Sequence, residues 1–140
     1  MNNWSYDYKD LVEVPEGGVA FVYSIFIDNR YYIGKKNFFT KRKKHFGKKE
    51  LALVTDKRKK TYHTIVTESN WKTYCSSSDE VKKLVLEGHE PTRTILRVCK
   101  TLKEATWLEE RLLHRHVGSK HYINDSIRGV FHRKEIEEWI

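Results

Sequence analysis

One acidic residue, Glu109, occupies a position where a carboxylate needs a partner. The capping box Thr101-Leu102-Lys103-Glu104 predicts a helix that begins there and ends before Gly118. The apolar stripe of this helix consists of Ala105, Leu108, Leu112 and Leu113. At 3.6 residues per turn, Glu109 lies inside that stripe, whereas Glu110 points toward its flank.

A carboxylate in an apolar stripe is costly unless it is ion-paired, hydrogen-bonded, protonated or bound to a metal. The helix considered alone favours an ion pair between Glu109 and one of the many arginines. Upstream, two aromatic segments that contain Tyr23 and Tyr32 add phenol groups that could share a site with this carboxylate. The chain as a whole therefore favours a metal-binding role for Glu109.

Length and charge limit the class of protein. A chain of 140 residues fits a single domain, residues 1–140, with one core. The sequence contains no stretch as long as a membrane span, and its N-terminus lacks the apolar run of a secretory signal. We therefore expect a cytoplasmic protein that does not bind a membrane.

The positive charge is concentrated in one segment. Residues 35–60 hold twelve Lys or Arg against two acidic residues, a local net charge of +10, with aromatic residues between the bases. This pattern is typical of nucleic-acid binding, although a solvated charged loop would have the same composition. The candidate nucleic-acid-binding residues are Lys35, Lys36, Lys41, Lys43, Lys44, Lys57, Lys59 and Lys60.

The order of predicted elements gives a mixed α/β (α+β) fold. After a lead-in over residues 1–18, residues 19–27 and 30–34 form a β-hairpin around a tight turn at Asp28-Asn29. The basic stretch is predicted to be part helix and part loop. Ser78 then caps a short helix that stops at Gly88, and residues 92–98 form a third strand before the helix that carries Glu109.

Four segments in this order resemble the successive motifs of the GIY-YIG nucleases. They are Phe21-Val22-Tyr23, Tyr32-Ile33-Gly34, Glu104-Ala105-Thr106-Trp107-Leu108-Glu109 and Tyr122-Ile123-Asn124. The resemblance covers about residues 19–130, with a basic insert over about 35–70, and is closest to small stand-alone endonucleases, some of them homing-type, encoded by tailed bacteriophages. The chain departs from the family in having Phe21 where the family name has glycine, and in a short spacing between the two tyrosines.

The resemblance implies a small three-stranded antiparallel sheet flanked by helices and a nuclease site. Tyr23 and Tyr32 match the two phenols that lie near the scissile phosphate in the family. Glu109 matches the single metal-binding glutamate, which would hold one Mg²⁺ or Mn²⁺ with waters and phosphate oxygens. Asn124 matches the asparagine that helps to hold the active site together.

The resemblance also implies a catalytic arginine, for which the sequence offers two candidates. Arg42 lies eight residues after Gly34, the spacing typical of the arginine on the family's first helix, and Arg58 competes with it. His45 and His63 are candidates for an auxiliary base, although a solvated histidine is the alternative for each.

The first hypothesis for function is a divalent-metal-dependent endonuclease that hydrolyses phosphodiester bonds in DNA. The alternatives are a catalytically silent nucleic-acid-binding module and a nuclease that acts mainly on RNA or branched DNA. Contacts with specific bases would come from the insert or from the second subunit of a homodimer. A phage-encoded protein would act in the cytoplasm of its bacterial host.

Overall fold

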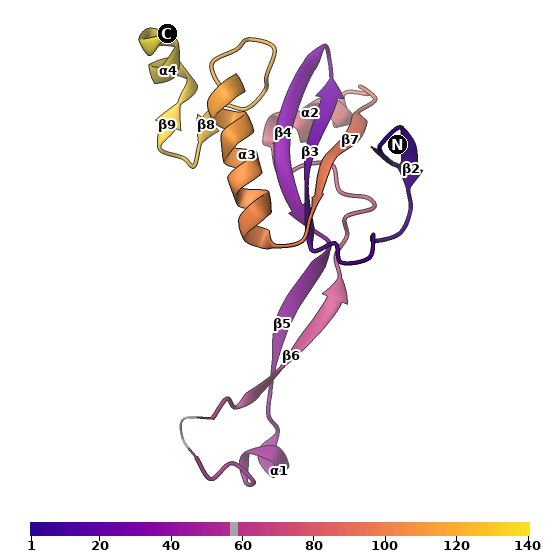
Figure 1. Ribbon diagram of the computed structural model, residues 1–140, viewed down its shortest axis with the longest axis vertical. Coiled ribbons are helices and arrows are strands. Elements are labelled where there is room, and N and C mark those ends of the chain that lie inside the picture. Colours follow the sequence, from indigo (N-terminus) through magenta and orange to yellow (C-terminus); the bar gives the residue numbers. More distant parts are fainter. Residues whose placement is uncertain (57–58) are drawn as a thin grey trace.

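The computed structural model describes residues 1–56 and 59–140, and its centre is a five-stranded mixed sheet (Figure 1). The strands run in the order β2-β1-β7-β3-β4. Their bounds are Trp4–Tyr6 (β1), Lys9–Leu11 (β2), Ala20–Ile27 (β3), Arg30–Asn37 (β4) and Thr92–Cys99 (β7). Strand β3 pairs antiparallel with both β7 and β4, and these three strands form the three-stranded antiparallel unit that the sequence predicts.

The prediction of only three strands was wrong, because the N-terminal residues form a hairpin that extends the sheet. Strand β1 pairs in parallel with β7, and β2 pairs with β1 at the outer edge. Trp4 anchors β1, since its side chain is 1% exposed and its indole Nε1 donates a hydrogen bond to the carbonyl of Trp71 at 2.6 Å. Burial of this large aromatic group stabilises a strand whose local sequence is otherwise polar.

The hairpin of β3 and β4 turns at Asp28 and Asn29, as predicted. Both residues have positive φ angles, 50° and 60°, which a tight two-residue hairpin turn requires and which these residue types tolerate. Strand β4 continues past the predicted end at Gly34, because its residues up to Asn37 pair with the first residues of β3.

The two predicted capped helices are confirmed. Helix α2 (Asp79–Leu86) begins at Ser78, whose hydroxyl accepts from the amide of Val81. Helix α3 (Leu102–His116) begins at Thr101, whose hydroxyl accepts from the amide of Glu104 at 3.1 Å. Each cap satisfies a backbone donor that the first helical turn would leave free.

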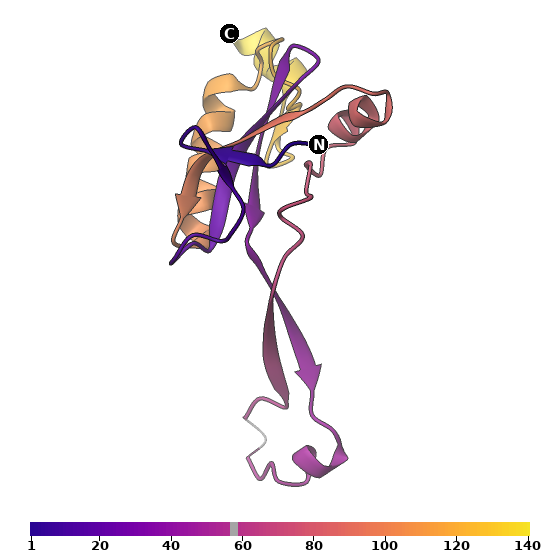
Figure 2. The same ribbon diagram turned by 90° about the vertical axis from the view of Figure 1, so that its right-hand side faces the viewer.

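The sheet has one core on each face, and α2 and α3 cover opposite faces (Figure 2). Successive side chains of β3 alternate between the two cores. Phe21 and Tyr23 pack with Val81 and Leu84 from α2. Ala20 and Val22 pack on the other face with α3, in the group that also includes Ile33, Ala105 and Leu113.

The basic insert forms an arm that extends away from the sheet (Figures 1 and 2). Strands β5 (Phe39–His45) and β6 (Tyr62–Glu68) make an antiparallel two-stranded ribbon, and the short helix α1 (Lys48–Leu51) lies at its far end. The prediction of part helix and part loop holds only for the far end of the arm, where α1 lies, and it missed the two strands. At the base, the amide of Ser69 donates to the carbonyl of Phe38 at 2.8 Å, so the chain leaves and re-enters the core at one point.

The C-terminal segment lies beside the outer edge of β4. It forms the two-residue strands β8 (Ser126–Ile127) and β9 (Phe131–His132), followed by the short helix α4 (Arg133–Trp139). Within the described residues, none of the helices combines the length and the apolar composition needed to span a lipid bilayer.

Candidate active site

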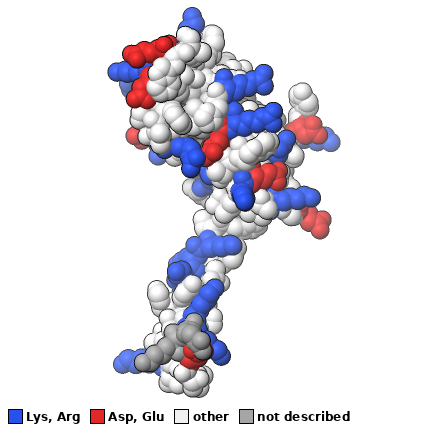
Figure 3. Space-filling model, turned by 60° about the vertical axis from the view of Figure 1, so that its left-hand side comes forward, with Lys and Arg blue, Asp and Glu red and all other residues white. Residues whose placement is uncertain are grey.

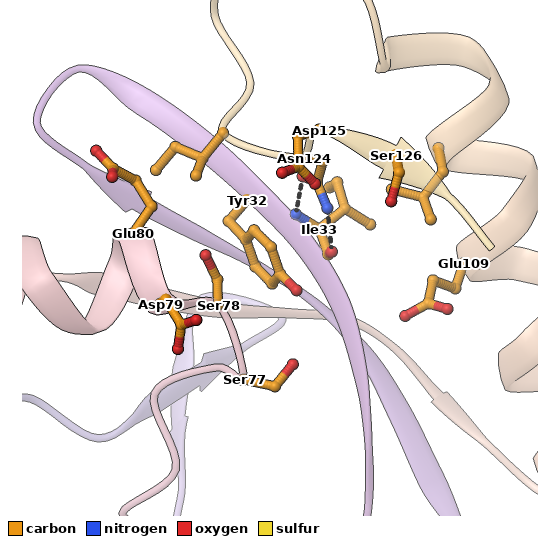
Figure 4. A pocket seen from close by; sticks show the side chains of 12 residues that line it. Tyr32, Ile33, Ser77, Ser78, Asp79, Glu80, Glu109, Asn124, Asp125 and Ser126 are labelled. Atoms are coloured by element: carbon orange, nitrogen blue, oxygen red, sulfur yellow. Dashed lines mark hydrogen bonds between the residues drawn. The ribbon is translucent and has the colours of Figure 1, made fainter. Parts of the chain in front are cut away.

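A polar pocket of about 380 Å³ lies at the outer edge of strand β4, where α2, α3 and the C-terminal segment meet (Figure 4). Its walls include Tyr32 from β4, Ser77 before α2, Glu109 from α3 and Asn124. In Figure 4 the phenol of Tyr32 and the carboxylate of Glu109 point toward one another across this space. The pocket therefore brings together three of the residues that the sequence analysis singles out.

The backbone of β4 explains how these groups are positioned. An edge strand presents free backbone donors and acceptors, and here the C-terminal segment covers them. The amide of Tyr31 donates to the carbonyl of His121 at 2.8 Å, and the amide of Ile123 donates to the carbonyl of Tyr31 at 2.7 Å. Two residues further along β4, at Ile33, the side chain of Asn124 instead forms the hydrogen bonds with the strand.

The side chain of Asn124 forms two hydrogen bonds with the backbone of Ile33. Its Oδ1 accepts from the amide of Ile33 at 2.9 Å, and its Nδ2 donates to the carbonyl of Ile33 at 2.8 Å. The asparagine side chain therefore acts as one more peptide group beside the strand. It is 7% exposed, so these two hydrogen bonds satisfy polar atoms that water does not reach freely.

Glu109 and Glu110 are adjacent in sequence but have different surroundings. Glu110 forms an ion pair with Arg128 at 3.3 Å. Within the described part of the chain, Glu109 forms no ion pair with a side chain, so the arginine-pairing alternative applies to its neighbour instead. The Glu109 carboxylate remains available on the pocket wall.

The pKa of Glu109 is raised above its usual value, mainly because the carboxyl is half-buried. The Lys35 ammonium opposes this shift, the nearby Glu110 adds to it, and a hydrogen bond from the Lys35 backbone also favours the charged form. A partly desolvated carboxylate of this kind gains more from a cation than an exposed one does.

Lys35 lies beside this carboxylate rather than on the arm. Its Nζ donates to the hydroxyl of Thr106 at 2.7 Å, and Thr106 precedes Glu109 by about one turn of α3. The sequence analysis assigned Lys35 to general nucleic-acid binding, whereas the structure places this ammonium next to the candidate metal ligand. No pattern in the sequence indicates this position of Lys35, because the two residues come together only where α3 packs against β4 in the folded protein.

The two motif tyrosines have different exposures. Tyr23 is 1% exposed in the core, while Tyr32 is half-buried and lines the pocket. Their ring centroids are 6.4 Å apart. Burial raises the pKa of both phenols above the ordinary tyrosine range, so both are neutral at physiological pH.

Sequence reasoning missed the serines that surround Tyr32. The hydroxyls of Ser76 and Ser77 hydrogen-bond the Tyr32 phenol and favour its ionised form, against the effect of burial. Ser76 is buried and has a φ of +84°, which is rare for a residue other than glycine. The sequence analysis used Ser78 as a helix cap, whereas in the structure Ser77 and Ser78 also line the pocket.

The candidate arginines and auxiliary bases do not join this pocket among the described residues. Arg42 lies on strand β5 of the arm, not on a helix, because residues 39–45 pair in register with β6. His45 packs against Tyr62, with ring centroids 6.2 Å apart, and Nε2 of His63 lies 3.2 Å from Glu50. Arg58 lies outside the described residues, as does Lys57. Catalytic roles for Arg42 and Arg58 stay predictions.

The remaining candidate nucleic-acid-binding residues divide between two places. Lys36 lies at the base of the arm, with its Nζ 4.1 Å from the centre of the Tyr74 ring. The others that the structure describes are exposed on the arm: Lys41, Lys43, Lys44, Lys59 and Lys60.

The pocket fits a hard divalent cation held by a single protein carboxylate. Among the described residues there is no group of three or more His, Cys, Asp or Glu that could enclose an ion. Mg²⁺ and Mn²⁺ retain several water ligands and use phosphate oxygens from a substrate, so one carboxylate suffices. Asp79, Glu80 and Asp125 also line the pocket but are exposed. Glu109 is the candidate for that carboxylate, because it is half-buried and forms no ion pair with a described side chain.

Comparison with known proteins identifies the family. The chain matches, over residues 4–128, the family model described as "Putative endonuclease segE, GIY-YIG domain". No curated protein and no solved structure matches the chain. Because the matched region covers the sheet, both core helices and every motif that lines the pocket, the chain belongs to this family of GIY-YIG nuclease domains.

Proposed function

We propose that the protein is a divalent-metal-dependent endonuclease that hydrolyses phosphodiester bonds in DNA. The observation that carries this proposal is the Glu109 carboxylate, which faces a polar pocket and forms no ion pair with a described side chain, while its neighbour Glu110 is paired. The GIY-YIG family implies a nuclease, and the metal and the DNA substrate are our extension of it.

Glu109 would hold one Mg²⁺ or Mn²⁺ through its carboxylate. When bound, such an ion would neutralise part of the negative charge that develops on the phosphoryl oxygens and on the leaving oxygen. The raised pKa of Glu109 means that the site strengthens as the carboxylate loses its proton.

Tyr32 and Lys35 would act on the phosphate and on the attacking water. The neutral phenol of Tyr32 can both accept and donate a hydrogen bond, so it can orient a water molecule in the pocket. The Lys35 ammonium, fixed by Thr106 beside Glu109, can bind a non-bridging phosphate oxygen. Asn124 would act indirectly, by holding the strand that carries both side chains.

Tyr23 would support Tyr32 rather than contact the substrate. It is buried in the core and is not one of the residues that line the pocket, and its phenol interacts with Tyr74 and Ser76. We assign it a positioning role.

The test compares wild type, Glu109→Gln and Glu110→Gln on supercoiled plasmid with Mg²⁺, Mn²⁺ or chelator. We expect wild type and Glu110→Gln to cut only with metal, and Glu109→Gln to lose activity by about 10²-fold or more, the scale of losing a principal electrostatic group. Glu110 is a matched control because it is the same residue type on the next position of the same helix. Equal activity of the two variants would overturn the assignment of Glu109.

Two other results would favour the other classes of function. If all three proteins bind DNA equally and none cuts plasmid, single strands, junctions or RNA, the domain is a binding module. If cleavage depends on Glu109 but is much faster on RNA or on branched DNA than on plasmid, the assignment of the active site is correct. The proposed substrate is then wrong.

A further inference from the structure

The β5–β6 arm, formed by Phe39–His45 and Tyr62–Glu68, has no core of its own among these described residues. Every residue of β5 is exposed, and β6 has only two partly buried positions, Tyr62 and Ile65. Its strands pair continuously from Phe39 opposite Glu68 to His45 opposite Tyr62. A two-stranded ribbon without a packed face is at best marginally stable in water, so its extension from the core suggests a partner surface.

Apart from one acidic residue at its base, the charged residues of the two strands are basic. Four consecutive residues of β5 are basic, namely Lys41, Arg42, Lys43 and Lys44, and none of them forms an ion pair with a described residue. Within the two strands the acidic residue is Glu68, which lies at the base and accepts a hydrogen bond from Trp71. On the face shown in Figure 3, blue Lys and Arg atoms extend along the arm, while red atoms appear at its tip.

Both faces of the ribbon are basic. Directly opposite residues share a face, so Lys41 and Lys43 project on one side and Arg42 and Lys44 on the other. Opposite these four residues on β6 lie Val66, Ile65, Thr64 and His63, so none of them meets an acidic side chain directly across the ribbon. A polyanion that contacts the ribbon on two sides fits this distribution better than a flat acidic surface does.

The dimensions select one kind of polyanion. Seven residues per strand give a ribbon about 23 Å long, and two strands with their side chains are about 10 Å wide. The major groove of B-DNA is about 12 Å wide and 8.5 Å deep and admits a two-stranded β-ribbon, whereas the minor groove is about 6 Å wide. Lying along the groove, rather than entering it end-on, lets the basic residues over the whole length of the ribbon contact phosphates.

We infer that the β5–β6 arm lies lengthwise in the major groove of duplex DNA. The arm then covers about 7 base pairs, at 3.4 Å per base pair. Lys and Arg on both faces reach the two phosphate walls, so the contacts of these four residues are with phosphates. This inference rests on the duplex-DNA part of the proposed function and does not need cleavage.

The same geometry excludes an RNA duplex as the preferred partner of the arm. The major groove of A-form RNA is deep and narrow, so side chains on a ribbon cannot enter it. The arm therefore contributes selectivity for B-form duplex DNA over double-stranded RNA.

The test uses the Glu109→Ala protein, so that binding is measured without cleavage, on a duplex of about 30 base pairs, or three helical turns. In this background, the arm variant carries Lys41→Gln, Arg42→Gln, Lys43→Gln and Lys44→Gln. The matched control carries Lys9→Gln, Lys103→Gln, Lys120→Gln and Lys134→Gln, four exposed lysines away from the arm with the same loss of charge. Circular dichroism verifies that all three proteins are folded.

The dissociation constant is measured over a series of salt concentrations. Each lost phosphate contact reduces the salt slope by about 0.9, so we expect the arm variant to reduce it by up to about 3.6 and the control to leave it nearly unchanged. Equal slopes for the two variants would overturn the inference. Tight binding of an RNA duplex that depends on the same four residues would overturn it as well.

Methylation interference then identifies the groove. Methylation of guanine N7 blocks the major groove, and methylation of adenine N3 blocks the minor groove. We expect N7 methylation to interfere over a continuous block of about 7 base pairs, and the arm variant to lose this block. Interference confined to adenine N3 would show a minor-groove contact instead. Failure of the nuclease proposal would appear separately, as wild-type protein that binds in this manner without cutting.

Discussion

The aromatic ring of Tyr23 lies directly against Gly34, its partner across the β3–β4 ladder. A Cβ atom added at Gly34 would lie 2.5 Å from Cζ of the Tyr23 ring, closer than non-bonded atoms approach. The glycine of the second motif therefore exists to accommodate the tyrosine of the first. The two motifs are one packing unit, and this unit sets the position of β4 beneath the pocket.

Replacing Gly34 with alanine should destabilise the protein substantially. The added methyl group would meet a ring that is fixed in the core, and overpacking of this kind costs about 1–3 kcal/mol. Chemical denaturation measures the loss. Gly47→Ala is the control, because a Cβ there meets no atom within 4 Å. Equal stabilities of the two variants would show that the Tyr23 ring moves freely.

Asn124→Ala should lower both stability and activity. It leaves the amide and carbonyl of Ile33 without their partners, at a cost of about 1–3 kcal/mol for each buried group. Hydrogen exchange at the Ile33 amide should accelerate in this variant, which a purely catalytic role for Asn124 would not cause.

Asn124→Asp separates the two hydrogen bonds. A carboxylate can still accept from the Ile33 amide but cannot donate to the Ile33 carbonyl, so it should protect the amide and still lose stability. If this variant were as stable as wild type, the Nδ2 hydrogen bond would contribute nothing to the edge of β4.

The elements predicted correctly from the sequence are those with local signals. Ser78 and Thr101 are helix caps that act within one turn, and Asp28-Asn29 is a turn that tolerates positive φ. Each depends on neighbours in the chain, so the sequence alone specifies it.

The elements that the sequence did not predict depend on distant contacts or on their absence. Strand β5 shows no apolar alternation, because neither of its faces is buried and alternation arises only where one face packs on a core. Strand β1 depends on the burial of Trp4 against residues far along the chain. Within the pocket, the ion pair of Glu110 with Arg128 and the position of Lys35 are likewise tertiary.

The raised pKa of Glu109 predicts a pH-dependent effect of Glu109→Gln on the stability of the metal-free protein. A carboxyl whose pKa is higher in the folded state than in the unfolded state is penalised when it ionises, so wild type loses stability as pH rises from the unfolded pKa through the folded pKa. Glu109→Gln should therefore be more stable than wild type above this window and similar to it below.

Denaturation midpoints from acidic to neutral pH, with chelator present, measure this difference. Glu110→Gln is the control, because it removes the ion pair with Arg128 and should not gain stability at neutral pH. Added Mg²⁺ should stabilise wild type and not Glu109→Gln. A Glu109→Gln protein that is less stable than wild type at neutral pH without metal would show that the pKa of Glu109 is not raised in the folded protein.

Tyr32→Phe should reduce cleavage about 10²-fold while leaving DNA binding intact, because the phenol that lines the pocket is lost without loss of the ring. Tyr23→Phe should mainly lower stability, since its hydroxyl interacts with Tyr74 and Ser76 inside the core. Single-turnover cleavage and denaturation distinguish the two effects. Equal losses of activity at unchanged stability would place both phenols in contact with the substrate.

Lys35→Gln should move the acid limb of metal binding to higher pH. The Lys35 ammonium lowers the pKa of Glu109, so its removal raises that pKa further and leaves less carboxylate at a given pH. Mn²⁺ titrations at several pH values measure the shift, and Lys41→Gln on the arm is the charge-matched control. Lys35→Arg should restore part of the effect, because the positive charge near Glu109 is kept. A metal affinity with the same pH dependence in Lys35→Gln and Lys41→Gln would show that Lys35 acts on the substrate alone.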